Sequence, residues 1–231
     1  MPSEVPAPST ATRSASRPAT ALRDLSHRFF IEGLTGMAHG LFASLILGTI
    51  LGQLGRLLPG AAGTWLTLLG AIATSLTGAG IGVGVAHRLK APTFVVVGAM
   101  VAGQVGARAA ALLSGTALQS DGGAPALVLN GPGEPLGAFI AAWAAVEAGR
   151  LVAGRTSLDI LVTPTLSVCA GGSAGLLVGP PISRLMISLG QLVNWGTERQ
   201  PLLMGIIVSA LMGIILTLPI SSAALGIILD L

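Results

Sequence analysis

NWGTERQPLLMGIIVSALMGIILTLPISSAAL, from Asn194 to Leu225, is the stretch that decides the fold class. It begins with polar residues and passes into an uncharged apolar run from Leu202 to Leu218. A run of this length is just sufficient for a bilayer-crossing helix, which takes roughly 17–25 residues. Pro219 then breaks the run, and Ser221 and Ser222 follow. Hydroxyls beside a broken helix at membrane depth predict a site that handles a solute within lipid.

Composition places the whole chain in the membrane. Charged residues make up 9% of the sequence and hydrophobic residues 52%, whereas soluble domains carry about 25% charged residues. The net charge of +3 comes from scattered basic residues, and aromatics are only 3%. A nucleic-acid surface needs a clustered basic patch or a stacking platform, so nucleic acid is excluded as a partner and the lipid bilayer is the expected one.

Apolar runs predict an all-α polytopic membrane protein with about six transmembrane helices. Residues 1–26 are rich in Pro, Ser, Thr and Ala and predict a disordered tail, and residues 27–231 form the transmembrane domain. Residues 22–32, which overlap the boundary between the two, suit an amphipathic interfacial lead-in. The expected spans are residues 34–58, 65–86, 93–113, 136–153, 158–178 and 202–218.

Segments rich in Gly and Pro are expected to interrupt these helices. Gly115 to Gly133 predicts an irregular loop, and Gly179-Pro180-Pro181 is expected to end the fifth span. Residues 182–195 are amphipathic and suit a re-entrant piece, so a broken or re-entrant segment is expected at the C-terminal end.

Basic residues alternate between loops. Four arginines precede the first span, Arg88 and Lys90 follow the second, and Arg150 and Arg155 follow the fourth. The positive-inside rule therefore predicts a cytoplasmic N-terminus. Small residues recur every four positions, as at Gly171, Gly175 and Gly179, which predicts close helix packing and permits a homodimer.

Ionisable groups inside spans are functional candidates by default. Glu147 is the deepest, and Arg150 follows three residues later on a neighbouring helix face. Two interpretations stay open for Glu147: an ion pair near the cytoplasmic boundary, or a residue facing a solute path. His39 and His87 suit interhelical hydrogen bonds better than proton relays. Asp159, together with Ser157, suits a helix cap.

The polar lead-in to the last span carries the substrate-binding candidates. Glu198, Gln200 and Asn194 combine a carboxylate with two amides, which together donate to and accept from vicinal sugar hydroxyls. Pro219, Ser221 and Ser222 supply a second polar element on the same hairpin. The competing interpretation is an interfacial Trp195 beside a solvated Glu–Arg pair. The sequence predicts no catalytic triad, no metal site and no cofactor, and the single Cys169 suits an inert small hydrophobe.

Several segments carry a family resemblance. GLFASLILGTILG, DILVTP, AGGSAGLLVGPPI and the Asn194–Leu225 block resemble the phosphotransferase-system EIIC-like membrane proteins, in particular the perfringolysin-regulator-type branch. The resemblance implies a multi-pass permease subunit of the bacterial cytoplasmic (inner) membrane. Such a subunit translocates a sugar while cytoplasmic EIIA/EIIB-type partners phosphorylate it, the phosphate coming from phosphoenolpyruvate through phosphohistidine carriers.

The chain departs from the family pattern in two respects. Family members continue with further spans after ISSAAL, so the transmembrane domain is expected to be incomplete at its C-terminus. The phosphoryl-carrying domains are not in this chain, so phosphotransfer would need separate subunits. The first hypothesis is therefore the sugar permease subunit, and the alternative is a membrane-embedded regulator or sensor without transport activity.

Overall fold

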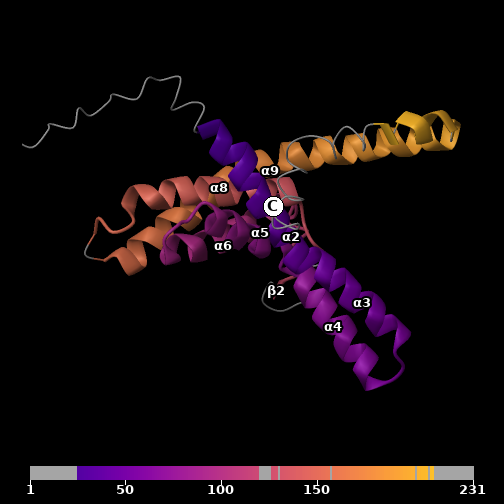
Figure 1. Cartoon of the computed structure of the whole chain (residues 1–231), viewed down its shortest axis with the longest axis horizontal. Helices are drawn as coiled ribbons and strands as arrows, with labels where there is room; N and C mark the ends of the chain where they lie inside the picture. Colours follow the sequence, from indigo (N-terminus) through magenta and orange to yellow (C-terminus); the bar gives the residue numbers. More distant parts are fainter. Residues whose placement is uncertain are drawn as a thin grey trace, which may run out of the picture.

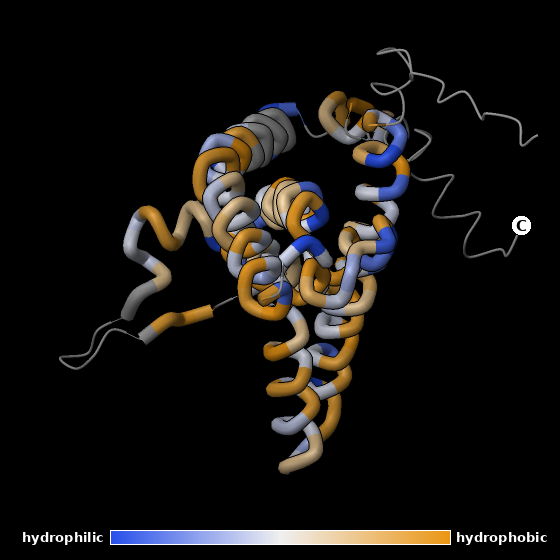
Figure 2. Tube along the Cα trace, turned by 90° about the vertical axis from the view of Figure 1, so that its left-hand side faces the viewer, coloured by the Kyte–Doolittle hydropathy of each residue, from blue (hydrophilic) through white to orange (hydrophobic). Residues whose placement is uncertain are grey.

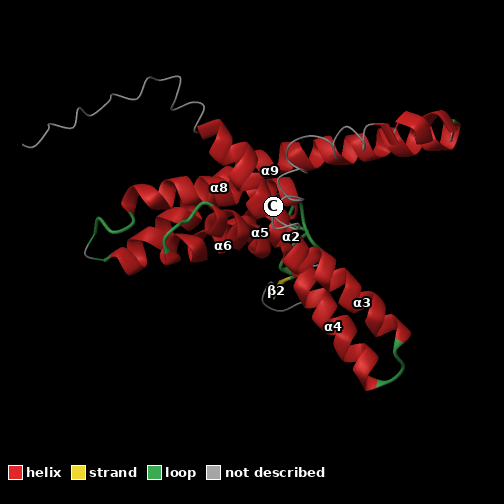
Figure 3. Ribbon diagram, viewed as in Figure 1, coloured by secondary structure: helices red, strands yellow, loops and turns green. Residues whose placement is uncertain are grey.

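The computed structural model describes residues 25–119, 126–129, 131–156, 158–200, 202–207 and 209–210. These residues are overwhelmingly helical (Figure 3), which confirms the all-α prediction. In chain order the helices are η1 (Arg28–Gly33), α2 (Leu34–Leu41), η2 (Phe42–Ile46), α3 (Leu47–Leu57), α4 (Ala61–Ser75), α5 (Thr77–Arg88), α6 (Thr93–Ala107), α7 (Ala109–Leu113), α8 (Pro135–Val152) and α9 (Asp159–Arg199). Residues 202–207 and 209–210 are also helical. The sites expected at Pro219, Ser221 and Ser222 lie outside the described residues.

The first helix is longer than the sequence predicts. It runs from Leu25 to Leu57, 33 residues, through the two π-helical turns η1 and η2. The expected interfacial lead-in is therefore the first part of this helix. Phe29 explains why, because its ring packs edge-on against Phe139 at 5.0 Å and Trp143 at 5.2 Å, both in α8. Aromatic burial holds the lead-in on the bundle.

The helical body consists of α2, α5, α6, α8 and the first half of α9 (Figure 1). Its core is made of small and β-branched side chains, with Phe139 as the largest fully buried residue. Backbones meet directly at glycines: a Cβ on Gly36 would lie 2.6 Å from the Gly84 carbonyl oxygen, and one on Gly175 would lie 2.8 Å from the Gly106 Cα. The predicted small-residue packing is confirmed, and it supplies the close contact that lipid alone does not drive.

The second predicted span is a broken helix. α4 and α5 meet at Leu76 with a bend of 56°, so this predicted span breaks there. The bend directs α4, paired with α3, away from the body as a long hairpin (Figure 1). Figure 2 shows both hydrophobic and hydrophilic positions along this hairpin.

The predicted end of the fifth span at Gly179-Pro180-Pro181 is wrong. α9 continues through Pro164, Pro180 and Pro181 to Arg199, so residues 182–195 extend this helix instead of forming a separate piece. Each proline removes one backbone donor. A Cβ on Gly179 would lie 2.6 Å from the Ala109 side chain, and this close packing against the body supports the helix where the prolines weaken it. The second half of α9 projects from the body (Figure 1).

The loop from Gly115 to Gly133 contains some regular structure, contrary to expectation. β1 (Leu118–Gln119) pairs antiparallel with β2 (Ala126–Leu127). The Val128 amide also donates to the Ala117 carbonyl at 2.8 Å, which extends the pairing by one bond. Two residues per strand are too few to show an alternating sequence pattern, which is why periodicity did not reveal them.

Three helices in the described part of the chain are long and apolar enough to cross a membrane: Leu25–Leu57, Pro135–Val152 and Asp159–Leu185. The bent α4–α5 pair makes four if it counts as one span, and α6 is apolar but shorter. The sequence prediction of about six also counted residues 93–113, which are interrupted at Arg108, and residues 202–218, of which the structure describes only a part.

Candidate functional site

The bend between α4 and α5 is held by one side chain of α6. In an uninterrupted helix the Ala79 amide would donate to the Ser75 carbonyl, four residues earlier. Here Gln104 stands between them: its Oε1 accepts from the Ala79 amide at 3.0 Å, and its Nε2 donates to the Ser75 carbonyl at 2.9 Å. The carboxamide thus replaces a missing peptide hydrogen bond. Backbone groups freed within a membrane need such a partner.

Arg108 acts at the same bend. It lies one turn beyond Gln104, is only 7% exposed, and donates through Nη2 to the Ser75 carbonyl at 3.3 Å. The same nitrogen donates to the Gly131 carbonyl in the loop before α8. A buried arginine in an apolar bundle is costly and is a functional candidate by default. Arg108 therefore joins the broken helix, α6 and the loop before α8.

Sequence reasoning missed both residues. Arg108 lies within the predicted span 93–113, and Gln104 precedes it by four residues on the same helix face. Two polar residues four positions apart in an otherwise apolar run could have indicated a polar site on this helix.

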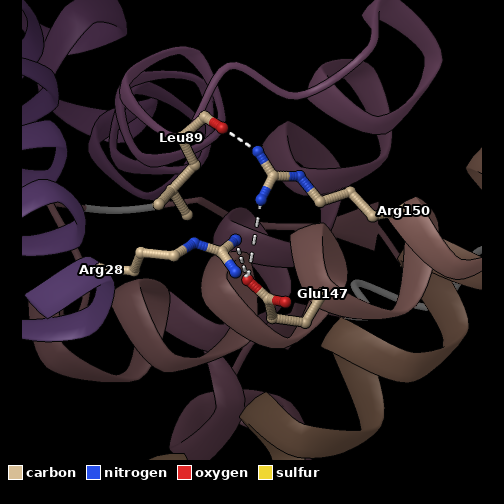
Figure 4. A network of polar contacts seen from close by, with 4 residues as sticks. All are labelled: Arg28, Leu89, Glu147 and Arg150. Atoms are coloured by element: carbon tan, nitrogen blue, oxygen red, sulfur yellow. Dashed lines mark hydrogen bonds and ion pairs between the residues drawn. The ribbon is translucent and has the colours of Figure 1, made fainter. Parts of the chain in front are cut away.

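Glu147 belongs to a second network (Figure 4). Its Oε1 accepts from Nη2 of Arg28 at 2.6 Å and lies 4.0 Å from Nη1 of Arg150. Arg150 also donates to the Leu89 carbonyl, at the turn between α5 and α6. The network joins the first helix, α8 and that turn, and both members of the Arg28–Glu147 pair are about one-third exposed, at 32% and 30%. This geometry favours the ion-pair interpretation of Glu147 over the solute-path one.

The expected sugar-contacting residues lie at the far end of α9. The Asn194 amide donates to the Glu198 carboxylate at 3.1 Å, one turn apart, and both side chains are exposed. Gln200 follows directly and is also exposed. The Arg199 guanidinium lies 5.8 Å from the Trp195 ring centroid, a cation–π distance. Asn194, Glu198 and Gln200 thus lie within two helical turns and point away from the body's core.

The remaining sequence candidates have simple surroundings. His39 and His87 are exposed. Asp159 accepts from the Gly154 amide at 2.9 Å and from the Thr163 hydroxyl at 2.5 Å, which agrees with its expected role at the start of a helix. Cys169 is exposed on an apolar face of α9. Within the described residues no three His, Cys, Asp or Glu side chains gather into a metal-binding group.

The projecting hairpin carries a groove with polar lining. It lies between α3 and α4 and has a volume of about 250 Å³. Its lining combines small residues with polar side chains: Gly48, Thr49, Gly52, Gln53, Arg56, Thr67, Gly70, Ala71 and Thr74. It ends at Thr74, next to the Ser75 carbonyl that Gln104 and Arg108 hold.

The chain matches a known protein family. Residues 31–231 match the model of the family described as "Phosphotransferase system, EIIC". The chain belongs to this EIIC family. It is thus a multi-pass membrane protein and a permease-type subunit of a sugar phosphotransferase system, with cytoplasmic phosphotransferase proteins as its class of partner. No curated protein and no solved structure matched the chain.

Proposed function

We propose that this EIIC protein carries a sugar across the bacterial inner membrane, N-terminus in the cytoplasm, for phosphorylation by EIIA/EIIB-type subunits. The observation that carries the proposal is the family match over residues 31–231. The helix break held by Gln104 and Arg108 supports it. Secondary transporters commonly use broken helices inside the membrane, because the freed backbone and its polar partners form sites for solutes.

The sugar contacts proposed from the sequence are Asn194, Glu198 and Gln200, followed by Pro219, Ser221 and Ser222. The Asn194–Glu198 hydrogen bond orients a carboxylate oxygen and an amide on one face of α9. A bound sugar would exchange that bond for contacts with vicinal hydroxyls, which both donate and accept. Glu147 stays in the proposal only as a residue that holds the first helix against α8, since its carboxylate already pairs with Arg28.

Phosphoenolpyruvate-dependent uptake tests the function. Membrane vesicles containing the full chain, supplied with the soluble phosphotransferase proteins, are offered a panel of labelled hexoses and hexitols. Uptake of one sugar as its phosphate supports the permease. Binding of a sugar without uptake of any member contradicts translocation and supports the regulator or sensor alternative.

A substitution at Glu198 tests the site. Glu198→Gln replaces a charged hydrogen-bond acceptor with a neutral one while keeping the size and shape of the side chain. A charge-assisted hydrogen bond is roughly twice as strong as a neutral one. We expect sugar binding to be lost while the protein stays folded in detergent. Ser188→Ala on the same helix is the control, because the Ser188 hydroxyl donates only to its own helix at Arg184. Unchanged sugar binding by Glu198→Gln would contradict the assignment of Glu198 to the sugar site.

A further inference from the structure

The α3–α4 hairpin exposes many large apolar side chains. Large apolar side chains on it are exposed, among them Ile50, Leu54 and Leu68. Both of its helices belong to segments long and apolar enough to cross a membrane. Helices with outward apolar faces of this kind are covered by lipid in a membrane protein. A polar groove between such helices therefore needs its own explanation.

Polar residues occupy one side of each helix. In α3, Thr49, Gln53 and Arg56 follow at intervals of four and three residues, which places them on one face. In α4, Thr67 and Thr74 are seven residues apart and line the same groove. The glycines between the two helices bring their backbones together: a Cβ on Gly48 would lie 2.8 Å from the Gly70 carbonyl oxygen. Close packing thus fixes the two polar faces side by side.

The groove is open at its centre. A Cβ on Gly52 would meet nothing within 4 Å, unlike one on Gly48 or Gly55 in the same helix. The volume of about 250 Å³ lies just below the range of about 300–1,000 Å³ typical of small-molecule pockets. The hollow therefore suits a small solute better than a peptide or a lipid chain.

The donors and acceptors in the groove specify the chemistry of that solute. Gln53 and Arg56 have no hydrogen-bond or ion-pair partner among the described residues. The hydroxyls of Thr49, Thr67 and Thr74 donate to carbonyls of their own helices at 2.7, 2.9 and 3.0 Å, which leaves their oxygens able to accept. The groove thus offers free donors from Gln53 and Arg56 and free acceptors from the threonines and Gln53.

Unsatisfied polar groups within hydrocarbon cost several kcal/mol each, so the groove must be filled by water or by a polar ligand. A neutral molecule with several hydroxyls matches a mixed set of donors and acceptors. An anion would find one guanidinium and would leave the acceptors unused.

From these observations we infer that the α3–α4 groove is a water-filled binding groove for a polyhydroxylated solute. The inference rests on the proposed function in one respect, because it assigns the groove to the transported sugar. It places a sugar-contacting surface on α3 and α4, on a different part of the molecule from Asn194 and Glu198. The groove leads from Arg56 near the hairpin tip to Thr74 at the helix break.

Thiol labelling of the full chain in lipid nanodiscs tests whether the groove holds water. In a Cys169→Ser background, Gln53→Cys places the sole thiol in the groove and Ile50→Cys places it on the apolar face of the same helix. A hydrophilic methanethiosulfonate reacts with the thiolate, and a thiol in apolar surroundings is rarely ionised, so Gln53→Cys should react at least roughly tenfold faster. Equal rates would overturn the inference.

Two further measurements complete the test: a variant that fills the groove, and protection of the Gln53→Cys thiol by added sugar. Gly52→Phe adds a ring where no backbone stands in the way and should slow labelling of Gln53→Cys by roughly tenfold, as expected when water is expelled. At least one sugar of the hexose and hexitol panel should also slow the reaction. Labelling that no sugar slows overturns the assignment to a polyhydroxylated solute. Oxidation of Gln53→Cys to a disulfide-linked dimer, with labelling blocked, assigns the groove to a second copy and overturns it too.

The two proposals fail separately. If sugar protects Gln53→Cys while vesicles show no uptake, the groove assignment holds and translocation is contradicted. If uptake is observed while Gln53→Cys and Ile50→Cys react alike, translocation holds and the groove is contradicted.

Discussion

The carboxamide of Gln104 lies 2.9 Å from the carbonyl oxygen of Ser75, 29 residues earlier in the chain. Its other end accepts from the Ala79 amide, so one side chain satisfies both backbone groups that the bend at Leu76 separates. A Cβ on Gly78 would lie 2.9 Å from the Gln104 oxygen, which shows why a glycine is needed beside it. The broken helix is therefore a specific structure held by α6.

Gln104→Leu should destabilise the protein. The substitution leaves the part-buried Ala79 amide without its acceptor, at about 1–3 kcal/mol. It leaves the Ser75 carbonyl with only the longer bond from Arg108. For a chain of this size each kcal/mol lowers the melting temperature by about 2–4 °C. Thermal unfolding in detergent measures the shift.

Gln53→Leu is the matched control for that experiment. It makes the same chemical change at a glutamine that bonds to no described residue, so its melting temperature should stay near that of the parent. Equal shifts for the two variants would contradict the role given to Gln104.

Arg28 and Glu147 should be coupled in a double-mutant cycle. They are 119 residues apart in sequence and 2.6 Å apart in the structure. Hydrogen bonds to charged groups contribute about 1.5–3 kcal/mol, so Arg28→Ala and Glu147→Ala should each destabilise while the double variant loses less than their sum. Chemical denaturation in detergent gives the coupling energy. Strict additivity would show that the pair contributes nothing measurable.

Gly36→Ala should destabilise the contact between α2 and α5. The added Cβ would lie 2.6 Å from the Gly84 carbonyl oxygen and 2.7 Å from the Val85 Cα. These are backbone atoms, which cannot move aside as easily as the end of a flexible side chain. Overpacking of this kind costs about 1–3 kcal/mol. Gly52→Ala is the control, since nothing lies within 4 Å of its added Cβ; there the gain in helix propensity should leave stability equal or higher.

The turns at Lys90 and Leu58 should face opposite sides of the membrane. Lys90 follows α5, and Leu58 follows α3 at the hairpin tip. In the Cys169→Ser background, an impermeant thiol reagent added outside intact cells should label Leu58→Cys and not Lys90→Cys, as the positive-inside rule predicts for a cytoplasmic Lys90. Labelling of both from outside would contradict the orientation.

The membrane class, the glycine packing and the position of most helices could be predicted from the sequence, because they depend on local properties. The apolar runs around Gly48, Ala142 and Gly171 are long enough to predict spans without knowledge of their neighbours. Glycines spaced by four predicted which helix faces meet. The last predicted span and its Pro219 break, by contrast, lie largely outside the residues that the structure describes.

The sequence alone did not predict where the described chain breaks or which polar residues gather there. Pro180 and Pro181 looked like a helix end, yet α9 passes through them because the body packs against it, while the actual break at Leu76 contains no proline. That break depends on Gln104 and Arg108, which reach it from another helix. Composition and periodicity thus determined that the chain spans a membrane. Only tertiary structure decided where its polar groups meet, because hydrogen bonds between helices depend on packing geometry that no local pattern encodes.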